Sequence, residues 1–449
     1  MIERVGIKNF KSYKNAELKL APLTVLIGAN ASGKTNALEA IRFLSWMAQG
    51  QKLSKLQNDD FIRGKIKNFP RSGEKSFTLE CTINKAGLSF ETLNFNLEEF
   101  NHLAIELEIR QGGDLHIGYE AISSYNMHTV PSTPPGYHYL YKTKTKSKGI
   151  NTNIEVEYNN FSRGGKKPLI ICNDQMSIFM QLASAARFQD GHKKARQVIP
   201  ERTHEFEKFL SRIQFLAPVP EKMRTYSYKT EKKLLENGDH LSSVIYDLIE
   251  NSEERSLNRK YLLQFISSLP EQNIADVGFI STPREEVMLE LKETFGGKEQ
   301  FYDTSSLSDG TLRVLSYAAA ILSAPSNSLL IIEEFENGVH PSRADKLLKS
   351  IYRIAKERSI TVLISTHNPA LLDALPDEAI PKVVFCYRDP ETGFSKLTRL
   401  EDLPHYPELI AQDTLGDLLT RGLIDHFVKH QPTEEERKRQ ASKWFESIK

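Results

Sequence analysis

Apolar and polar positions in the first 50 residues predict three strands and a helix. Residues 5–10 have a short strand pattern, and residues 16–20 alternate apolar with polar side chains. Residues 23–27 form a compact apolar run, which is typical of a buried strand. A glycine-rich turn follows, and the apolar residues within 36–47 approximate helical spacing.

The middle of the chain changes character twice. Residues 77–83 and 105–109 alternate in short runs and predict an antiparallel sheet. Residues 111–170 are rich in Gly, Pro, Tyr, Thr and Lys without long periodic segments, so we expect loops and an irregular β-arm there. From about 174 to 270 helical patterns dominate, and they predict helices at 175–187, 204–213, 241–250 and 261–269.

The last part returns to alternating strands and helices from about residue 277. Its pattern predicts strands at 287–291, 329–332, 361–365 and 383–387, with helices at 311–323 and 343–358. No internal repeat and no heptad run long enough for a coiled-coil arm is present. The fold class is therefore α/β: one discontinuous domain, 1–110 with 276–449, interrupted by an inserted α+β or helical region at 111–275.

Composition excludes several classes of protein. The 449 residues carry 59 Lys and Arg against 58 Asp and Glu, which argues against a generally basic DNA binder but leaves room for a local basic patch. Three scattered cysteines (Cys81, Cys172 and Cys386) form no disulfide or paired zinc pattern. The chain begins without a signal-peptide pattern and has no long apolar run, so we expect a cytoplasmic protein that does not enter a membrane.

The turn after residues 23–27 matches the phosphate-binding pattern G-x-x-x-x-G-K-[ST] at every fixed position. Backbone N–H groups of such a loop surround phosphates, the lysine reaches the β- and γ-phosphates, and the hydroxyl of the last residue binds Mg²⁺. We expect ATP and Mg²⁺ here, with Thr35 as a metal ligand. The expected nucleotide-binding residues are Gly28, Ala29, Asn30, Ala31, Ser32, Gly33, Lys34, Thr35 and Asn36.

Residues 329–332 are four apolar residues that end in two acids, Glu333 and Glu334. In phosphate-loop enzymes an acid at this place holds Mg²⁺, and a neighbouring carboxylate can orient or deprotonate the attacking water. We assign the metal to Glu333 and the catalytic base to Glu334. Taken alone, the pattern also fits a strand that ends at a solvated acidic turn.

Leu307-Ser308-Asp309-Gly310-Thr311 precedes this strand and leads into a helix. Here the chain resembles ABC-type ATPases, whose signature Leu-Ser-Gly-Gly-Gln occupies the same place; Ser308 and Gly310 match, whereas Asp309 and Thr311 depart. An Asp at the third position is similar to the RecF/SMC-like branch. Read alone, the segment is more often a helix N-cap and turn.

The resemblance extends to the run after the acidic strand and to His367. Glu336-Asn337-Gly338-Val339-His340-Pro341 looks like a run found in prokaryotic RecF-like and OLD-type AAA ATPases, and His367 matches the family's γ-phosphate-sensing histidine. The motif order covers about residues 1–95 and 205–425. Gln57 and Gln214 are candidates for the family's Q-loop.

This resemblance implies an ABC-type ATPase head with an N-terminal lobe at 1–110 and a C-terminal lobe at 276–449. It also implies a homodimer, or a higher homo-oligomer, that sandwiches ATP, with Ser308, Asp309 and Gly310 completing the partner's site. Members of the group often work with a separately encoded nuclease or toxin effector, frequently in phage defence.

Residues 136–170 are locally basic. Lys142, Lys144, Lys146 and Lys148 stand at every second position, which would put them on one face of a strand, after Tyr137, Tyr139 and Tyr141. Such a face could contact nucleic-acid phosphates and stack bases. It is equally what a protected edge strand or a solvated loop looks like.

The leading hypothesis is an ATPase that acts as a sensor or scaffold and controls an effector. One alternative is an OLD-type nuclease with its own ATPase, although the stretch after His367 is short and lacks the Asp-x-Asp pattern of that nuclease domain. Another alternative is a RecF-like DNA-repair ATPase, which would need the basic arm to bind DNA.

Overall fold

In this computed structural model the main feature is a large mixed sheet. In the described part of the chain it has 14 strands, in the order β10-β15-β16-β3-β17-β18-β2-β1-β4-β5-β6-β7-β8-β9. The structure describes residues 1–58, 61–84, 100–124, 139–162, 165–267, 273–339, 341–403, 406–410 and 413–429.

One half of the main sheet is a parallel core. Its strands are β10 (Gln214–Leu216), β15 (Leu329–Ile332), β16 (Thr361–Thr366), β3 (Leu23–Ile27) and β17 (Val384–Arg388). Alternate residues of β3 enter two different cores, since Val25 packs on one face of the sheet and Leu26 on the other. This burial on both faces explains the unbroken apolar runs and confirms the strands predicted at 23–27, 329–332 and 361–365.

The other half of the main sheet is mostly antiparallel. Its strands are β18 (Ser395–Arg399), β2 (Tyr13–Lys19), β1 (Ile2–Phe10), β4 (Ser76–Ile83), β5 (His102–Ile109), β6 (Leu115–Ser123), β7 (Tyr139–Thr145), β8 (Asn153–Tyr158) and β9 (Leu169–Asn173). The pairing of β4 with β5 confirms the predicted antiparallel sheet. The prediction of loops and an irregular β-arm at 111–170 was wrong, because β6 to β9 continue this sheet strand by strand.

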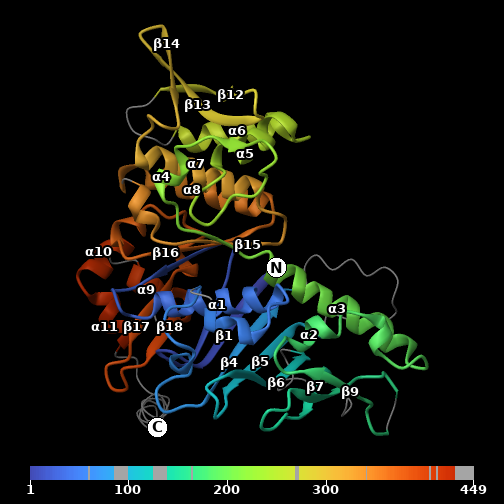
Figure 1. Ribbon diagram of the computed structural model, residues 1–449. Helices are drawn as coiled ribbons and strands as arrows, with labels where there is room; N and C mark the ends of the chain where they lie inside the picture. The colour runs from blue at the N-terminus through green and yellow to red at the C-terminus, as the bar shows by residue number, and fades with distance from the viewer. Residues whose placement is uncertain are drawn as a thin grey trace, which may run out of the picture.

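Helices cover both faces of the sheet (Figure 1). On one face, α1 (Lys34–Ala48) and α3 (Lys193–Ser211) share a core with β1 and its antiparallel neighbours. The other face is covered by α5 (Leu241–Tyr246), α6 (Arg255–Ile266), α7 (Asp309–Ser323) and α8 (Pro341–Glu357). The helices predicted at 36–47, 311–323 and 343–358 are therefore confirmed.

Two helix predictions need correction. The helix predicted at 175–187 is only α2 (Ile178–Gln181) and a separate 3-10 turn, Ala185–Arg187. α2 is a single turn with Leu182 as its C-cap, and the Gln181 side chain ties it back to the backbone of Asn173 and Met176. α3 begins at Lys193, not at 204, and continues through Pro200.

A smaller second sheet lies at the far end of the part that carries α5 to α8 (top of Figure 1). It contains β11 (Ser227–Tyr228), β13 (Glu286–Phe295), β12 (Ile274–Ser281) and β14 (Lys298–Asp303). The short helices α4 (Pro220–Met223), α9 (Tyr406–Ile410), α10 (Leu415–Thr420) and α11 (Leu423–Lys429) complete the α-helices of the described residues. No helix among the described residues is long and apolar enough to cross a membrane.

Candidate functional site

The glycine-rich loop runs from the end of β3 to the first residue of α1, as its motif predicts. Two of its positions admit only glycine: a Cβ on Gly28 would lie 2.1 Å from the Cys386 carbonyl oxygen, and Gly33 has φ +121°. The first turn of α1 contains no acidic side chain. The N–H groups at this helix start therefore provide a positive end suited to an anion.

Lys34 lies across its own loop. Its Nζ donates to the carbonyl oxygens of Gly28 at 2.5 Å and of Ala29 at 3.1 Å. Burial lowers the pKa of Lys34, while the nearby carboxylates of Glu336 and Glu334 act in the opposite direction.

The carboxyl ends of β3, β15 and β16 meet in one pocket of about 350 Å³. This follows from their parallel order, which places the ends of neighbouring strands at the same edge of the sheet. The pocket joins the phosphate loop to the acidic strand end and to His367. It is lined by Ala29, Asn30, Ala31, Ser32, Gly33, Lys34, Thr35, Asn36, Leu38, Arg63, Glu333, Glu334, Glu336, Ser365, Thr366, His367 and Arg388.

Glu333 is held on two sides. Its backbone N–H donates to the carbonyl oxygen of Leu216 at 3.0 Å, and its carboxylate accepts from Arg42 at 3.1 Å. Burial raises the pKa of Glu333, and the Arg42 guanidinium opposes that shift. Thr35 lines the same pocket, so a hydroxyl and a carboxylate are available there, and these oxygen donors are the kind that Mg²⁺ prefers.

Glu334 occupies an unusual backbone conformation. Its φ of 50° and ψ of 51° lie in the left-handed region, which non-glycine residues seldom adopt outside functional sites or turns. The Ser365 hydroxyl accepts from its N–H at 3.2 Å, and its carboxylate accepts from the Asn337 amide at 2.9 Å. The side chain is exposed and aligned by these contacts at the pocket edge.

Glu336 and His367 form a pair that the sequence did not predict. The Glu336 carboxylate accepts from the His367 backbone N–H at 2.8 Å and also contacts its Nδ1. Glu336 is nearly buried, whereas about half of the His367 side chain is exposed. The third acid in the Glu-Glu-x-Glu spacing was the available signal for Glu336; Arg63 and Arg388 also line the pocket but belong to no motif.

The segment around Ser308 is separate from this pocket. Ser308 caps α7, with its hydroxyl accepting from the Thr311 N–H at 3.2 Å. Arg224 donates to the Leu307 carbonyl oxygen at 2.7 Å and to Asp309 at 2.6 Å. Neither Ser308, Asp309 nor Gly310 lines the pocket of its own chain, and neither do Gln57 and Gln214. The proposed function in trans stays a prediction.

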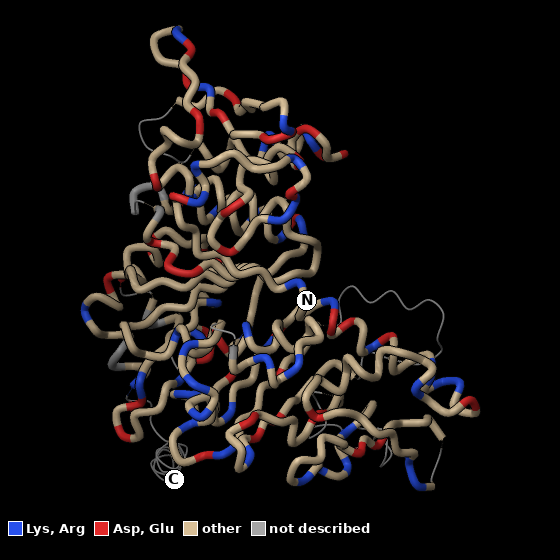
Figure 2. The backbone as a smooth tube through the Cα atoms, viewed as in Figure 1, with Lys and Arg blue, Asp and Glu red and all other residues tan. Residues whose placement is uncertain are grey.

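The basic arm differs from its predicted geometry. β7 ends at Thr145, so only Lys142 and Lys144 share a strand face, and both approach Glu157, at 3.6 and 3.4 Å. Lys146 lies beyond the strand and pairs with Glu106 and Glu108, each at 3.3 Å. Figure 2 shows acidic residues interspersed with basic ones in this region.

The aromatic part of that prediction was wrong for Tyr141, which is buried and donates to Glu120 at 2.7 Å. Tyr139 lines the hollow described next, and the Lys142 ammonium lies 4.8 Å from its ring centroid. Lys148 is exposed beyond the end of β7, whereas Tyr137 and His340 lie outside the described residues.

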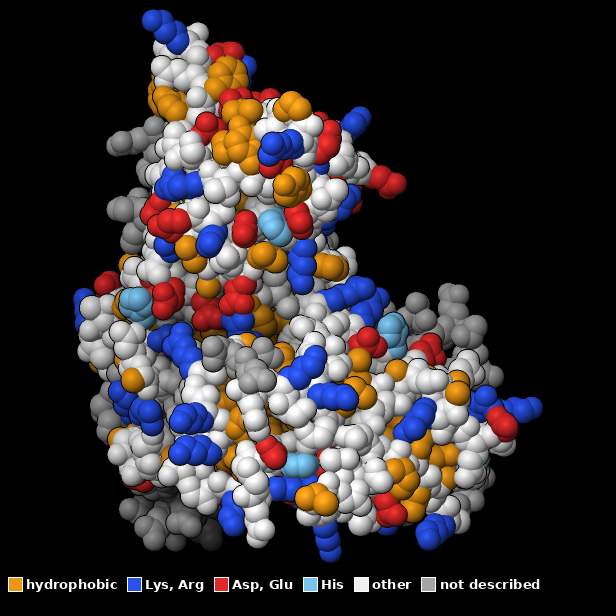
Figure 3. Space-filling model, in the orientation of Figure 1, with side chains coloured by type: hydrophobic (Ala, Val, Ile, Leu, Met, Phe, Trp, Pro, Cys, Tyr) orange, Lys and Arg blue, Asp and Glu red, His pale blue; other side chains and the backbone are white. Residues whose placement is uncertain are grey.

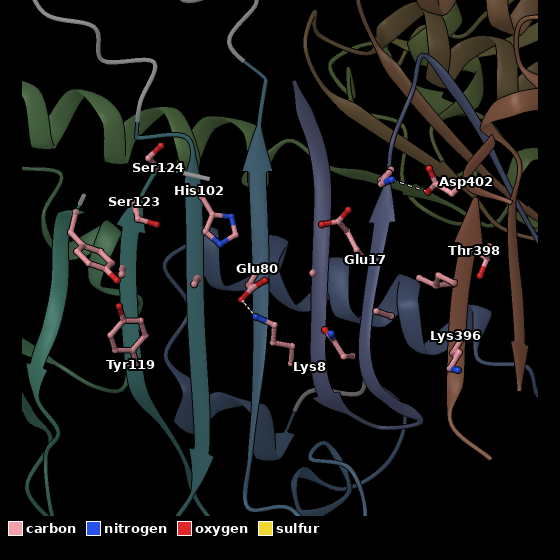
Figure 4. Close-up of a pocket in the computed structure, with 18 residues that line it drawn as sticks. Lys8, Glu17, Glu80, His102, Tyr119, Ser123, Ser124, Lys396, Thr398 and Asp402 are labelled. Carbon is pink, nitrogen blue, oxygen red and sulfur yellow. Dashed lines mark hydrogen bonds and ion pairs between the residues drawn. The ribbon is translucent and has the colours of Figure 1, made fainter. Parts of the chain in front are cut away.

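A second hollow of about 870 Å³ lies on the open face of the antiparallel half, with the helices behind the sheet (Figure 4). Four of its charged side chains form two ion pairs with one another: Lys8 with Glu80 at 2.5 Å and Lys19 with Asp402 at 2.8 Å. None of the predicted nucleotide, metal or signature residues lies there. Figure 3 shows, on the viewed face, acidic side chains gathered instead where the upper and lower parts of the molecule meet.

A glycine-rich loop between a buried parallel strand and a helix start, beside an acidic strand end, defines a phosphate-loop protein of the ABC type. Residues 23–101 and 181–373, more than half of the chain, match the family "AAA domain, putative AbiEii toxin, Type IV TA system". The chain belongs to this family.

Two relatives and two solved structures show how far the similarity reaches. An ATP/GTP phosphatase of Helicobacter pylori is 24% identical over 399 residues, 86% of this chain and 90% of that protein. The DNA replication and repair protein RecF of Bacillus thuringiensis is 36% identical over 92 residues, 19% of this chain and only 24% of RecF.

The SmcHead bound to the C-winged helix domain of ScpA has a TM-score of 0.45 at 14% identity, covering 88% of this chain and 96% of that one. The SMC head domain from Thermotoga maritima has a TM-score of 0.38 at 13% identity, covering 89% and 98%. Because both TM-scores are below 0.5, the description of the fold rests on the strand order given above and not on these two structures.

Proposed function

We propose that this chain is a Mg²⁺-dependent ATPase whose two-lobed head, 1–110 with 276–449, closes as a homodimer around ATP and controls a separate protein effector, a nuclease or toxin. The inserted region would be 111–275. The family description, which names a toxin and a type IV system, supports such a pairing and a function in anti-phage defence.

The observation that carries the ATPase proposal is the single pocket shared by the phosphate loop, Glu333, Glu334 and His367. These residues come from three strand ends that are more than 300 positions apart in the chain at the extremes. A glycine loop alone would support phosphate binding, whereas the added carboxylates supply the groups that hydrolysis needs.

In the proposed mechanism the loop N–H groups and the start of α1 bind the phosphates. Lys34 leaves its two carbonyl partners and places its charge against the β- and γ-phosphates. Thr35 and Glu333 would hold Mg²⁺, which when bound neutralises charge on the phosphates. Glu334 orients and deprotonates the attacking water, and its fixed backbone keeps the carboxylate at the pocket edge.

His367 would sense the γ-phosphate. Because Glu336 holds both the backbone N–H and the ring of His367, the imidazole is restrained before nucleotide arrives. Ser308, Asp309 and Gly310 would complete the partner's site, and their place outside their own pocket supports this division. Making and losing those contacts would convert hydrolysis into movement of the two heads.

The test compares Lys34→Ala with Glu334→Gln. Lys34→Ala leaves the phosphate charge under-compensated, so we expect ATP binding to be lost. Glu334→Gln keeps the size of the side chain but removes the base, so we expect retained binding, lost hydrolysis, and a larger ATP-bound species in gel filtration. Lys260→Ala, a lysine of α6, is the control and should behave as wild type.

Unchanged ATP turnover in Lys34→Ala would contradict the assignment of the site. If Glu333→Gln alone gives the trapped dimer, the functions of the two acids are exchanged.

Nucleic acid is a second proposed partner. The match to RecF over 92 residues favours it, and Lys142, Lys144, Lys146 and Lys148 are the proposed contacts. Their ion pairs with Glu157, Glu106 and Glu108 reduce the charge available to phosphates.

A further inference from the structure

Arg42 lies between two carboxylates beside the proposed metal ligand. Its Nη1 and Nη2 donate to the two oxygens of Glu236 at 2.6 and 2.7 Å, and Nη2 also donates to Glu333 at 3.1 Å. The guanidinium stacks 4.0 Å from the ring centroid of Phe215, and only 17% of the side chain is exposed. The fork geometry and the ring together fix the position of this cation.

The backbones of both acids bond to the same edge strand or to the residue directly after it. The Ala217 N–H donates to the carbonyl oxygen of Glu236 at 2.8 Å, directly after β10. The Glu333 N–H donates to the Leu216 carbonyl oxygen, in β10 itself. Arg42 from α1, Glu236 and Glu333 therefore belong to one frame built around β10.

The two contacts of Arg42 are unequal. Glu236 takes the bidentate pair, whereas Glu333 accepts from Nη2 alone, through a single oxygen. Glu236 therefore meets most of the positive charge, and Arg42 can orient Glu333 without neutralising it. A carboxylate oriented in this way binds a cation more tightly than one that rotates freely.

We propose that Arg42, anchored by Glu236, is a positioning residue that aims the Glu333 carboxylate at Mg²⁺. The inference rests on the proposed function of Glu333 as a metal ligand. It assigns to α1 a second task, because the same helix that presents Lys34 to the phosphates also aligns the acid opposite them.

The test measures metal affinity in Arg42→Gln, with Mn²⁺ replacing Mg²⁺ so that binding is seen directly by electron paramagnetic resonance in the presence of a non-hydrolysable ATP analogue. We expect Mn²⁺ to bind about 10–100-fold more weakly, the effect that loss of such outer partners has at metal sites. The Mg²⁺ concentration that half-saturates ATP hydrolysis should rise similarly. Analogue binding in EDTA should not change, because Lys34 and its loop are untouched.

Two further variants, Glu236→Gln and the double variant with both Arg42→Gln and Glu236→Gln, test whether Glu236 anchors Arg42. If Arg42 acts through its bond to Glu236, the single variants should each weaken Mn²⁺ binding and the double variant should be no worse than the more affected single one. Arg259→Gln is the matched control, since Arg259 is also held between two carboxylates, Glu250 at 2.9 Å and Asp276 at 2.6 Å, away from the pocket. It should keep wild-type Mn²⁺ affinity.

The outcomes separate the inference from the proposed function. If Lys34→Ala and Glu334→Gln behave as proposed while Arg42→Gln binds Mn²⁺ normally, only the inference is overturned. Equal losses of analogue binding with and without metal would make Arg42 a structural residue and also overturn it. If Lys34→Ala retains ATP binding, the proposed function falls, and the inference falls with it.

Discussion

At the scale of single residues, one buried carboxylate of the sheet, that of Glu120, is matched by directed hydrogen bonds. Glu120 on β6 is completely buried, and its carboxylate accepts from Tyr141 and from the backbone N–H groups of Ile178 and Phe179 at 2.7 to 2.8 Å. It therefore caps the start of α2 from inside the sheet. Burial nevertheless raises the pKa of Glu120 to about 7, with those donors acting in the opposite direction.

This raised pKa predicts a pH-dependent stability. The folded chain binds the Glu120 proton more tightly than the unfolded chain does. The contribution of Glu120 to the free energy of unfolding is therefore fully present below about pH 4.5 and is lost as pH rises towards 7. The shift corresponds to about 3 kcal/mol. Glu120→Gln should remove this slope, and because its amide would face at least one N–H donor, it should cost about 1–3 kcal/mol at pH 5.

Urea unfolding between pH 5 and 8 measures both effects. Glu299→Gln, which changes an exposed carboxylate on β14, should keep the wild-type slope. A wild-type slope in Glu120→Gln would mean that another group titrates in this interval.

Residues of the site could be predicted from the sequence where they belong to one continuous motif. The loop from Gly28 to Thr35 and the pair Glu333 and Glu334 follow buried strands, so local pattern and motif suffice. Arg42 and Glu236 lie 194 positions apart, and nothing in either local sequence marks the contact. The Glu-Glu-x-Glu spacing was the available signal for Glu336, but its bond to His367 joins two neighbouring strand ends and could not be predicted from that spacing.

At the scale of elements, the antiparallel half shows why short strands escape pattern analysis. β8 has buried apolar residues only at Ile154, Val156 and Tyr158, too few to outweigh the loop-like composition around them. The edge strand β9 is protected by side chains from outside the sheet. Arg187 donates to the Ile171 carbonyl oxygen at 2.5 Å, and Gln181 pairs with the backbone of Asn173. Such protection limits pairing with other chains.

The lysines on and after β7, which β8 separates from this edge, are the residues of the nucleic-acid prediction. Replacing Lys142, Lys144, Lys146 and Lys148 together by Gln should weaken duplex DNA binding and flatten its salt dependence by up to about 0.9 per lost phosphate contact. ATP hydrolysis without DNA should survive, because none of the four lines the nucleotide pocket. Filter binding across a range of salt concentrations measures the slope.

A control with Lys232, Lys233, Lys260 and Lys298 changed to Gln removes the same charge from residues that lie on neither β7 nor its neighbouring strands. Equal effects in both variants would indicate non-specific attraction. Unaltered binding in the first variant would leave its lysines as ion-pair partners of Glu157, Glu106 and Glu108.

At the scale of the whole molecule, the sheet joins segments that are distant in sequence. β3 pairs with β16 and β17, so strands near the start and the end of the chain form one parallel core. The alternation of strands and helices predicted this discontinuous α/β class. It could not predict that β10, inside the supposed insert, would enter the core beside β15, since three residues carry too little pattern.

The position of Ser308 outside its own pocket leads to a prediction about two copies of the chain. If Ser308 completes the partner's site, Ser308→Arg should leave ATP binding by the monomer intact while it eliminates hydrolysis and ATP-driven dimer closure. Arg224 holds this segment in place through Leu307 and Asp309. The backbone that carries the guanidinium added by Ser308→Arg is therefore rigid. Loss of the helix cap should cost only about 1 kcal/mol, which thermal unfolding can verify.

Mixing this variant with Lys34→Ala provides the decisive measurement. A mixed dimer has one site with both defects and one site with neither. Random mixing makes about half of the dimers mixed, so about a quarter of wild-type hydrolysis should return if the two sites fire independently. Strict coupling between the sites would lower that yield. If isolated Ser308→Arg monomers instead lose ATP binding, the segment acts in its own site, and the proposed dimer with shared nucleotides is wrong.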